Sequence, residues 1–413
     1  MRILSGRAAA KQVEKLASRG WQLAAVEPEV RQIIEGVRRN GDRALRSYAE
    51  RWDGLAQGIP VRVPDAELEA AWESATPQFR SSLKAAAGNI RQFCHRQKPS
   101  EWVHKRDGIS VGQLVRPLES VGCYVPGGRY PLVSTLLMTV IPAQVAGVKR
   151  ICVVSPQPKQ EVLAAAGMLG VREFYRVGGA QAVAALAYGT RSIARLDKIV
   201  GPGNLYVTAA KKLVAFDCAI DFLAGPTEAV VLSDRGRAEF IAADLVAQAE
   251  HDPEALSVFI TTRRPLAESV AWWATNLARP NKVARESLQR NGVILLAESR
   301  QQSLDWANQL APEHITVDSP DVRSIQNAGS IFVGDYSPQA AGDYASGPNH
   351  VLPTAGVARF RGGLSVLDFV KLISVQRLSP QGLGRIAPVI ESLAENEGLK
   401  AHAESVRVRY NHA

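Results

Sequence analysis

Cysteine is scarce in this sequence, and its four cysteines, Cys94, Cys123, Cys152 and Cys218, lie far apart. No C-x-x-C pair occurs, which argues against a small disulfide scaffold, a cysteine-based zinc finger and a thioredoxin-like site. We therefore expect buried, reduced thiols in a cytoplasmic protein. A long apolar run is also missing. The most apolar stretch, 132–148, is too short and too often interrupted by polar residues, proline and glycine to span a membrane.

No long run of lysine or arginine accompanies the formal net charge of +9, which comes from 49 basic and 40 acidic residues. A positive excess can indicate nucleic-acid binding. However, zinc-finger spacing and RNP-type aromatic motifs are missing as well. The basic residues mostly stand beside acids, as in the segment 35–43. We interpret the charge as a basic solvated surface and expect no nucleic-acid partner.

The composition is that of a globular protein, with 46% hydrophobic and 22% charged residues. A length of 413 residues can bury a sizeable core, and it predicts about two to four domains. Apolar positions spaced i, i+3, i+4, i+7 predict a helix over 28–50 that is interrupted at Asn40–Gly41. A second helical stretch is predicted over 65–96.

From about residue 117, short β-rich runs alternate with alanine-rich helical runs. This alternation predicts βαβ units and parallel sheets. Strands are expected at 151–154, 174–177, 198–200, 228–232, 257–261, 293–296, 315–317 and 331–333, and helices at 161–169, 180–188, 205–214 and 237–250. Two further helices, 381–395 and 401–408, are expected after Phe369.

We therefore predict an α/β protein with two Rossmann-like α/β domains that lack the usual G-x-G-x-x-G motif. The first domain is discontinuous and comprises 26–116 and 230–365, and the second comprises 117–229. Residues 1–25 form an N-terminal helical arm, and 366–413 form a small helical C-terminal element. A transit peptide is the alternative for the start of the chain, because its first 20 residues contain a single acid.

Three glycine-rich turns, 126–128, 178–181 and 201–204, stand in place of a G-x-G-x-x-G motif. The last two lie between a predicted strand and a predicted helix, where backbone N–H groups can bind a phosphate. Glycine can equally serve only to permit a tight turn. The turns alone therefore do not identify NAD as a ligand.

Histidine is also scarce, and four of the seven histidines stand next to acids or amides. Gln248 and His251 are three residues apart at a predicted helix end, so both side chains can face one cation. Glu313 and His314 place an acid beside an imidazole at the start of a predicted strand. The other three histidines are expected at the surface: His95, His104 and His412.

The two remaining histidines of this group lie late in the chain. Asp343 and His350 mark the ends of a loop rich in glycine and proline, and His402 follows Glu397 by five residues. Histidine and oxygen ligands without thiolate suit zinc in an accessible site. The alternative is that each histidine is an ordinary hydrogen-bonded residue.

The sequence resembles the histidinol dehydrogenase family from about residue 28 to 409. The most specific stretches are YVPGGRYPLVSTLLM (124–138), GGAQAVAALAYGT (178–190), GPGNLYVTAAK (201–211), AGPTEAVVL (224–232), DLVAQAEHDP (244–253), APEH (311–314), NAGSIFVG (327–334), GDYASGPNHVLPT (342–354), GLSVLDF (363–369) and EGLKAHAESVRVR (397–409). So many ordered motifs are not expected by chance.

The resemblance implies a role for each matching position. One Zn²⁺ per subunit would be held by Gln248, His251, Asp343 and His402. Glu313 and His314 would be the acid/base pair. Substrate would contact Thr227, His350 and Glu397 in addition to the metal ligands and His314, and NAD⁺ would contact Tyr124, Gln181 and Asn204. Thr227 departs from the serine that is common in the family, but it keeps the hydroxyl.

The resemblance also implies an activity. The family oxidises L-histidinol to L-histidine through L-histidinal with NAD⁺, as the last step of histidine biosynthesis. It implies a homodimer in which the C-terminal element enters the partner's active site, with the zinc and substrate on the first α/β domain and NAD⁺ on the second. Alternatives are a relative that oxidises another alcohol such as a sulfonated diol, a zinc hydrolase and, least favoured, a nucleic-acid binder.

Overall fold

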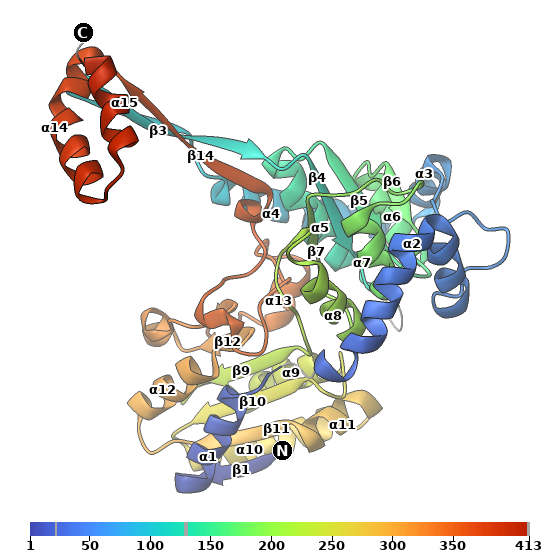
Figure 1. The fold of residues 1–413 in the computed structure, drawn as a ribbon. Coiled ribbons are helices and arrows are strands. Elements are labelled where there is room, and N and C mark those ends of the chain that lie inside the picture. Colours follow the sequence, from blue (N-terminus) through green and yellow to red (C-terminus); the bar gives the residue numbers. More distant parts are fainter. Residues whose placement is uncertain (21–22, 128–130, 411–413) are drawn as a thin grey trace.

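The computed structural model describes residues 1–20, 23–127 and 131–410. Two parallel sheets, each covered by helices, form the body of the molecule, and a long β-ribbon carries two helices away from it (Figure 1). The predicted α/β fold with parallel sheets is confirmed. Among the described helices, none is long and apolar enough to cross a membrane.

The first sheet has five parallel strands in the order β6-β5-β4-β7-β8. They are β4 (Ser120–Tyr124), β5 (Arg150–Val154), β6 (Glu173–Tyr175), β7 (Lys198–Val200) and β8 (Ala219–Ile220). In chain order this is 3-2-1-4-5, so the direction of strand addition reverses between β4 and β7. Such a switch point, at the carboxyl ends of the strands, is the usual ligand position of a Rossmann-like sheet.

The second sheet repeats that topology. Its order is β1-β11-β10-β9-β12-β13, with every pair parallel. The strands are β1 (Arg2–Ser5), β9 (Glu228–Leu232), β10 (Leu256–Thr261), β11 (Gly292–Leu296), β12 (His314–Val317) and β13 (Ser330–Val333). Without β1, the order is again 3-2-1-4-5 in chain order. Strands β9 and β10 are buried at every position, as expected for a parallel sheet covered on both faces.

The N-terminal segment differs from the helical arm expected over 1–25. Strand β1 adds an edge to the second sheet beside β11, and α1 (Gly6–Ala17) then packs on α12 (Arg300–Leu310). Ala9 and Val13 of α1 are buried in the core of this unit. The segment is therefore part of the second sheet's domain. Strand β1 has only four residues, and its hydrophobic pattern is too short to be recognised in the sequence.

The helices over 27–97 also differ from expectation, because they cover the five-stranded sheet and not the six-stranded one. They are α2 (Glu27–Trp52), α3 (Asp65–Ser74) and α4 (Pro77–Gln97). Helix α2 bends at Gly41, whose φ of 52° lies in the left-handed region, so the predicted interruption is confirmed. Val30 and Ile34 share a core with α7, and Leu83 and Ile90 share one with β4 and α5. An amphipathic pattern shows which helix face is buried, but not which sheet it covers.

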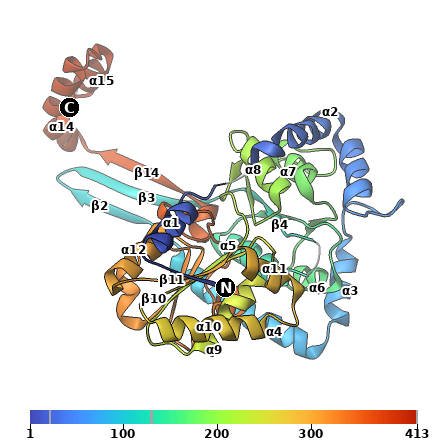
Figure 2. The ribbon, with the colours of Figure 1, turned by 90° about the horizontal axis from the view of Figure 1, so that it is seen from below.

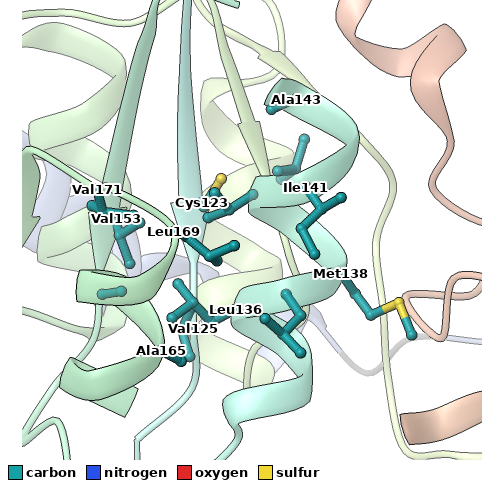
Figure 3. Packing of buried hydrophobic residues seen from close by; sticks show 14 of the residues in the cluster. Cys123, Val125, Leu136, Met138, Ile141, Ala143, Val153, Ala165, Leu169 and Val171 are labelled. Carbon is teal, nitrogen blue, oxygen red and sulfur yellow. The ribbon is translucent and has the colours of Figure 1, made fainter. Parts of the chain in front are cut away.

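The core of the first sheet is densely filled between β4, β5, α5 and α6 (Figure 3). Cys123 points from β4 towards Ile141 of α5, and Val153 of β5 lies beside Val171, whereas Met138 points away towards a C-terminal part of the chain (Figure 3). The helices of the two units are α5 (Val133–Ala146), α6 (Gln160–Met168), α7 (Gly179–Tyr188), α8 (Leu205–Val214), α9 (Ala238–Ala249), α10 (Arg264–Leu277), α11 (Lys282–Arg290) and α13 (Gln339–Tyr344). The predicted βαβ alternation is confirmed.

The C-terminal part of the chain forms an arm that stands away from both sheets (Figures 1 and 2). Its stem is a three-stranded antiparallel ribbon of β2 (Trp102–Arg106), β3 (Ile109–Pro117) and β14 (Val370–Leu378), and its end carries α14 (Pro380–Asn396) packed on α15 (Lys400–Tyr410). The two C-terminal helices are as predicted. The strand 370–378 inside the element expected to be helical, 366–413, was not predicted.

Candidate active site

The candidate active site lies where β9 and β12 begin, beside α13 and the loop that follows it. Thr227 directly precedes β9, and Glu313 directly precedes β12. The two strands pair with His314 opposite Ala229. The sheet register therefore brings the segments 227–229 and 313–314 side by side, although they are far apart in sequence.

The Glu313 carboxylate is held at this strand edge by three groups. It is only 7% exposed, and its Oε2 accepts hydrogen bonds from the Thr227 hydroxyl at 2.7 Å and from the Glu228 backbone N–H at 2.9 Å. The same oxygen lies 3.6 Å from His314 Nδ1. Glu313 is therefore fixed beside the imidazole, as an acid/base pair requires.

The His314 imidazole is 3% exposed and lies between two carboxylates. Its Nδ1 faces Glu313, and its Nε2 lies 3.5 Å from Asp343 Oδ1. Burial alone would lower the pKa of His314, but the charges of Glu313 and Asp343 outweigh it and raise this pKa to about 10. Among the described residues, none lies within hydrogen-bond distance of its buried Nδ1.

Asp343 is the shared acid of this site. Besides His314, it lies 4.0 Å from His350 Nδ1, and its Oδ2 contacts Gln248 Nε2 at 3.2 Å. Burial would raise its pKa, but the neighbouring histidines, His314 first, hold the pKa of Asp343 below its usual value. Burial beside the same carboxylate raises the pKa of Asp244 on α9 to about 6.

The orientation of the Gln248 amide tests whether a cation suits this place. Thr227 Oγ1 lies 3.1 Å from Gln248 Oε1, but its single hydrogen is taken by Glu313 at the shorter distance. With its oxygen and nitrogen exchanged, the amide donates to Thr227 and leaves its oxygen near Asp343. In that orientation the two oxygens would lie about 3.2 Å apart, the distance between Gln248 Nε2 and Asp343 Oδ2, which would suit a shared ion with ligand distances of about 2.0–2.2 Å. The donor set therefore fits a divalent cation.

His251 lies just beyond α9 at the side of a cavity of about 530 Å³. The imidazole is exposed, and the cavity extends from it along Tyr344 to Leu132, Val133 and Leu137. These residues come from both sheet units, so the cavity lies between them. Its apolar wall and polar edge suit a small amphipathic ligand.

His350 belongs to the loop that joins the two units across this region. Its Nε2 lies 3.4 Å from the Thr135 hydroxyl of α5, and the neighbouring Asn349 donates to the Met138 carbonyl at 2.7 Å. Burial lowers the pKa of His350 more than the charge of Asp343 raises it. The imidazole is therefore neutral at ordinary pH and available as a hydrogen-bonding group.

The three residues expected to contact NAD⁺ lie at the carboxyl ends of the five-stranded sheet. Tyr124 ends β4, and its hydroxyl accepts from Gly179 N at 3.0 Å. Gln181 donates to Asp53 at 3.0 Å, and Asn204 caps α8 by accepting from Val207 N. The structure thus brings them to one edge, at the switch point of the sheet. Tyr124 and Gln181 are buried, so their polar groups shape the turns there.

Two expected site residues, Glu397 and His402, lie elsewhere. Both are exposed and belong to the end of the arm, which Figure 1 shows well apart from α13. Within the described ranges 1–20, 23–127 and 131–410, no group of three or more histidine, cysteine, aspartate or glutamate side chains is arranged to hold a metal ion. Gln248, His251 and Asp343 therefore make at most a partial ligand set in one chain.

Some residues near the site were not found from the sequence. Thr135 contacts His350, and Glu228 contacts the Glu313 backbone. Asp53, at the end of α2, accepts from Gly178 N and from Gln181. An acid at the start of the otherwise apolar run EAVVL was a usable signal for Glu228, because a buried acid needs partners. Among the expected surface histidines, His95 and His104 are exposed. His412 lies outside the described residues, as does Gly128 of the first glycine-rich turn.

Two parallel sheets have a dinucleotide-binding topology, and the second carries a buried acid–imidazole pair at its edge. Together these features define the class as an α/β enzyme. A family model described as histidinol dehydrogenase matches residues 17–410. The chain belongs to the histidinol dehydrogenase family, whose members are oxidoreductases.

Individual proteins of the family are similar over nearly their whole length. The histidinol dehydrogenase of Methanothermobacter thermautotrophicus is 50% identical over 396 residues, covering 92% of each chain. That of Haloarcula marismortui is 48% identical over 400 residues, covering 94% of each. The crystal structure of histidinol dehydrogenase from Elizabethkingia anophelis superposes with a TM-score of 0.95 at 34% identity, covering 100% of this chain and 98% of that one.

Proposed function

We propose that this chain oxidises L-histidinol to L-histidine through L-histidinal, using two NAD⁺, as the last step of histidine biosynthesis. The observation that supports it best is the Glu313–His314 pair held against Asp343 in a member of the histidinol dehydrogenase family. The same membership disfavours the other-alcohol and zinc-hydrolase alternatives.

We propose that Gln248, His251 and Asp343 hold one Zn²⁺ together with the partner subunit's His402. A bound zinc ion would act as a Lewis acid that orients and polarises the substrate. A cation bound at Asp343 would also act on the neighbouring His314. At a pKa of about 10 the imidazole is protonated at neutral pH, whereas a general base must be neutral. Any positive charge at Asp343 would lower that pKa towards the range a base needs.

The NAD⁺ site is proposed at the carboxyl edge of the five-stranded sheet. Tyr124, Gln181 and Asn204 surround the glycine turns there, and the N-terminus of α8 is free of acids in its first turn, which suits a phosphate. NAD⁺, when bound, would accept a hydride in each of the two oxidations. Gly127 and Gly178 pack so closely on Pro156 that a Cβ atom would clash there, so these turns have little freedom.

The acid and the imidazole divide the proton transfers. His314 takes the proton of the alcohol as the carbinol carbon is oxidised, and Glu313 takes a proton from the water that adds to the aldehyde. Glu313 is suited to the second role because Thr227 and the Glu228 N–H hold one oxygen in place. His350 and Thr227 are proposed to orient the substrate.

We propose a homodimer in which each active site is completed by the partner's arm. Glu397 directly follows α14, and His402 lies in α15, and Figure 1 shows both helices apart from α13. The arm also exposes apolar side chains that a second copy would cover: Trp102, Val103, Leu372, Ile373, Val389 and Leu393. The partner subunit's Glu397 would then contact the substrate.

The setting proposed is the cytoplasm, with no nucleic-acid partner. The four cysteines are free and buried, which fits a reducing compartment. Several surface arginines lie beside acids, such as Arg38 and Arg39 beside Glu35, so the basic residues there are interspersed with negative charge.

The deciding experiment follows NADH absorbance with L-histidinol and NAD⁺, before and after chelation and after zinc is returned. We expect two NADH per histidinol, loss on chelation and recovery with zinc. The variant His251→Ala should lose bound zinc and activity, whereas His95→Ala, at an exposed position on α4, should keep both. An active His251→Ala enzyme with full zinc content would contradict the ligand assignment, and absence of NADH formation by the wild type would contradict the proposed function.

A further inference from the structure

Glu228 is a buried carboxylate beside the candidate acid/base pair, and no step of the proposed reaction uses it. It is 3% exposed. Its oxygens accept four hydrogen bonds, from Arg19 Nε at 2.6 Å, a terminal nitrogen of Arg19 at 2.5 Å, Ala355 N at 2.8 Å and Glu313 N at 3.3 Å. Two of the four therefore come from the backbone of segments that form the site.

Glu228 and Glu313 hold each other reciprocally. The Glu228 N–H donates to the Glu313 carboxylate at 2.9 Å, while the Glu228 carboxylate accepts from the Glu313 N–H. These two hydrogen bonds fix both the backbone and the side chain of Glu313 relative to β9. A carboxylate suits this arrangement, because both of its oxygens accept hydrogen bonds and neither acts as a donor.

Arg19 supplies the positive charge that faces the Glu228 carboxylate. It stands two residues beyond α1, 209 residues away in sequence, and its guanidinium pairs with both carboxylate oxygens of Glu228. It also donates to the Leu310 carbonyl at 3.0 Å. Leu310 ends α12, and residues 311–312 lead from it to Glu313. Arg19 thus contacts one end of that connection directly and the other end, Glu313, through Glu228.

A buried carboxylate without a counter-charge takes up a proton or draws in water. Loss of Arg19 would therefore release the Glu313 N–H or the Ala355 N–H from Glu228, or both. Release of the Glu313 N–H would loosen the turn that carries Glu313 and His314. Release of the Ala355 N–H would loosen the chain after Thr354, whose hydroxyl accepts a hydrogen bond from Gly225 N at 2.9 Å.

We propose that Arg19 and Glu228 are positioning residues: the N-terminal segment, through Arg19, holds the Glu313–His314 pair in its working geometry. The inference rests on the proposed function for the identity of the reaction, but not for the geometry itself. It gives the first α-helix and its C-terminal extension a part in catalysis, in addition to their packing on the six-stranded sheet.

The competing explanation is that Arg19 acts independently of Glu228, by attaching the end of α1 to α12 through the Leu310 carbonyl. A double-mutant cycle separates the two. If Arg19 acts by balancing the charge of Glu228, its removal matters much less once that charge has been removed. If Arg19 acts independently of Glu228, Arg19→Ala changes kcat and amide exchange equally whether position 228 is glutamate or glutamine.

The experiment compares wild type, Arg19→Ala, Glu228→Gln and the double variant. We expect Arg19→Ala to lower kcat for histidinol oxidation by about ten-fold or more, with the KM for NAD⁺ nearly unchanged, and to lower it by less than about three-fold in the Glu228→Gln background. Arg19→Lys keeps the charge and should retain most of kcat. Arg7→Ala removes an exposed arginine of the same helix and should change nothing.

A second measurement does not depend on the reaction. Amide hydrogen exchange over 311–317 and 353–357 should be faster in Arg19→Ala than in wild type, and the increase should be much smaller in the Glu228→Gln background. Equal effects of Arg19→Ala in both backgrounds, in kcat and in exchange, would overturn the inference. If the wild type fails to oxidise histidinol, the proposed function is wrong, while the exchange cycle still decides the role of Arg19.

Discussion

Lys211 and Asp221 form a buried ion pair directly beneath the turn that contains Gly201. Their side chains are 2% and 1% exposed. Lys211 Nζ also donates to the Gly201 carbonyl at 3.0 Å, and Asp221 Oδ2 accepts from the Gly201 N–H at 2.8 Å. The pair therefore fixes both backbone groups of a glycine at φ 110°, at the switch point of the five-stranded sheet.

Replacing Lys211 should destabilise the protein strongly. In Lys211→Met the Asp221 carboxylate is left buried without its partner, which typically costs about 3–5 kcal/mol in the free energy of unfolding. Lys212→Met is the matched control, because the adjacent Lys212 pairs with Glu27 at a half-exposed position, and its loss should cost less than about 1 kcal/mol. Urea unfolding measures both. Equal destabilisation by the two variants would show that burial of the pair is not what matters.

A second buried acid, Asp53, should affect cofactor binding more than stability. Its Oδ2 accepts from Gly178 N at 2.9 Å and from Gln181 Nε2 at 3.0 Å. Asp53→Ala removes both bonds and frees the turn, so we expect the KM for NAD⁺ to rise by about ten-fold, the equivalent of one or two hydrogen bonds. Asp53→Asn keeps an acceptor oxygen and should remain near wild type. A raised KM in both variants would indicate that charge, and not the hydrogen bonds, is required.

Some elements of the fold can be recognised from their own residues, whereas others depend on a distant partner. Strand β9, EAVVL, is buried throughout, and a continuous apolar run of this kind can be recognised without knowing its neighbours. Strand β14 is exposed along almost its whole length, so its residues carry no burial pattern. It forms a strand because it pairs with β3, which only the fold reveals.

In the site, likewise, only relationships between residues close in sequence could be predicted. Glu313 and His314 are adjacent in the chain, so their pairing was visible as a motif. By contrast, the contacts of Arg19 with Glu228 and of Asp53 with Gln181 join residues more than a hundred positions apart, and one charged residue without periodicity gives no sign of its partner. The sheet on which α2 to α4 pack escaped prediction for the same reason.

The four cysteines should be unreactive in the folded protein at pH 8. Burial raises the pKa of the Cys94 thiol to about 11 and those of Cys123 and Cys218 to about 12, and it raises that of Cys152 well above its usual value. Because thiolate is the reactive form and forms only as pH rises through the pKa, each folded thiol stays neutral at pH 8, whereas an unfolded one with a pKa of about 8.5 is partly ionised. A chromogenic disulfide reagent should react with no thiol in the native protein and with all four thiols in denaturant. A fast-reacting thiol in the native protein would contradict this assignment of burial.

The position of His402 on the arm makes subunit sharing testable by complementation. His402→Ala and His251→Ala should each be inactive, since one removes the group contributed by the arm and the other removes a group of the body. In a heterodimer, the arm of the His251→Ala subunit would meet the body of the His402→Ala subunit and form one intact site, while the second site would carry both defects. Random exchange of subunits at equal amounts should therefore restore about a quarter of wild-type activity, because a two-fold dimer exchanges the same element in both directions. Mixing either variant with itself is the control. If heterodimers verified by mass spectrometry remain inactive, each chain must complete its own site, and the arm would have to fold back onto its own body in solution.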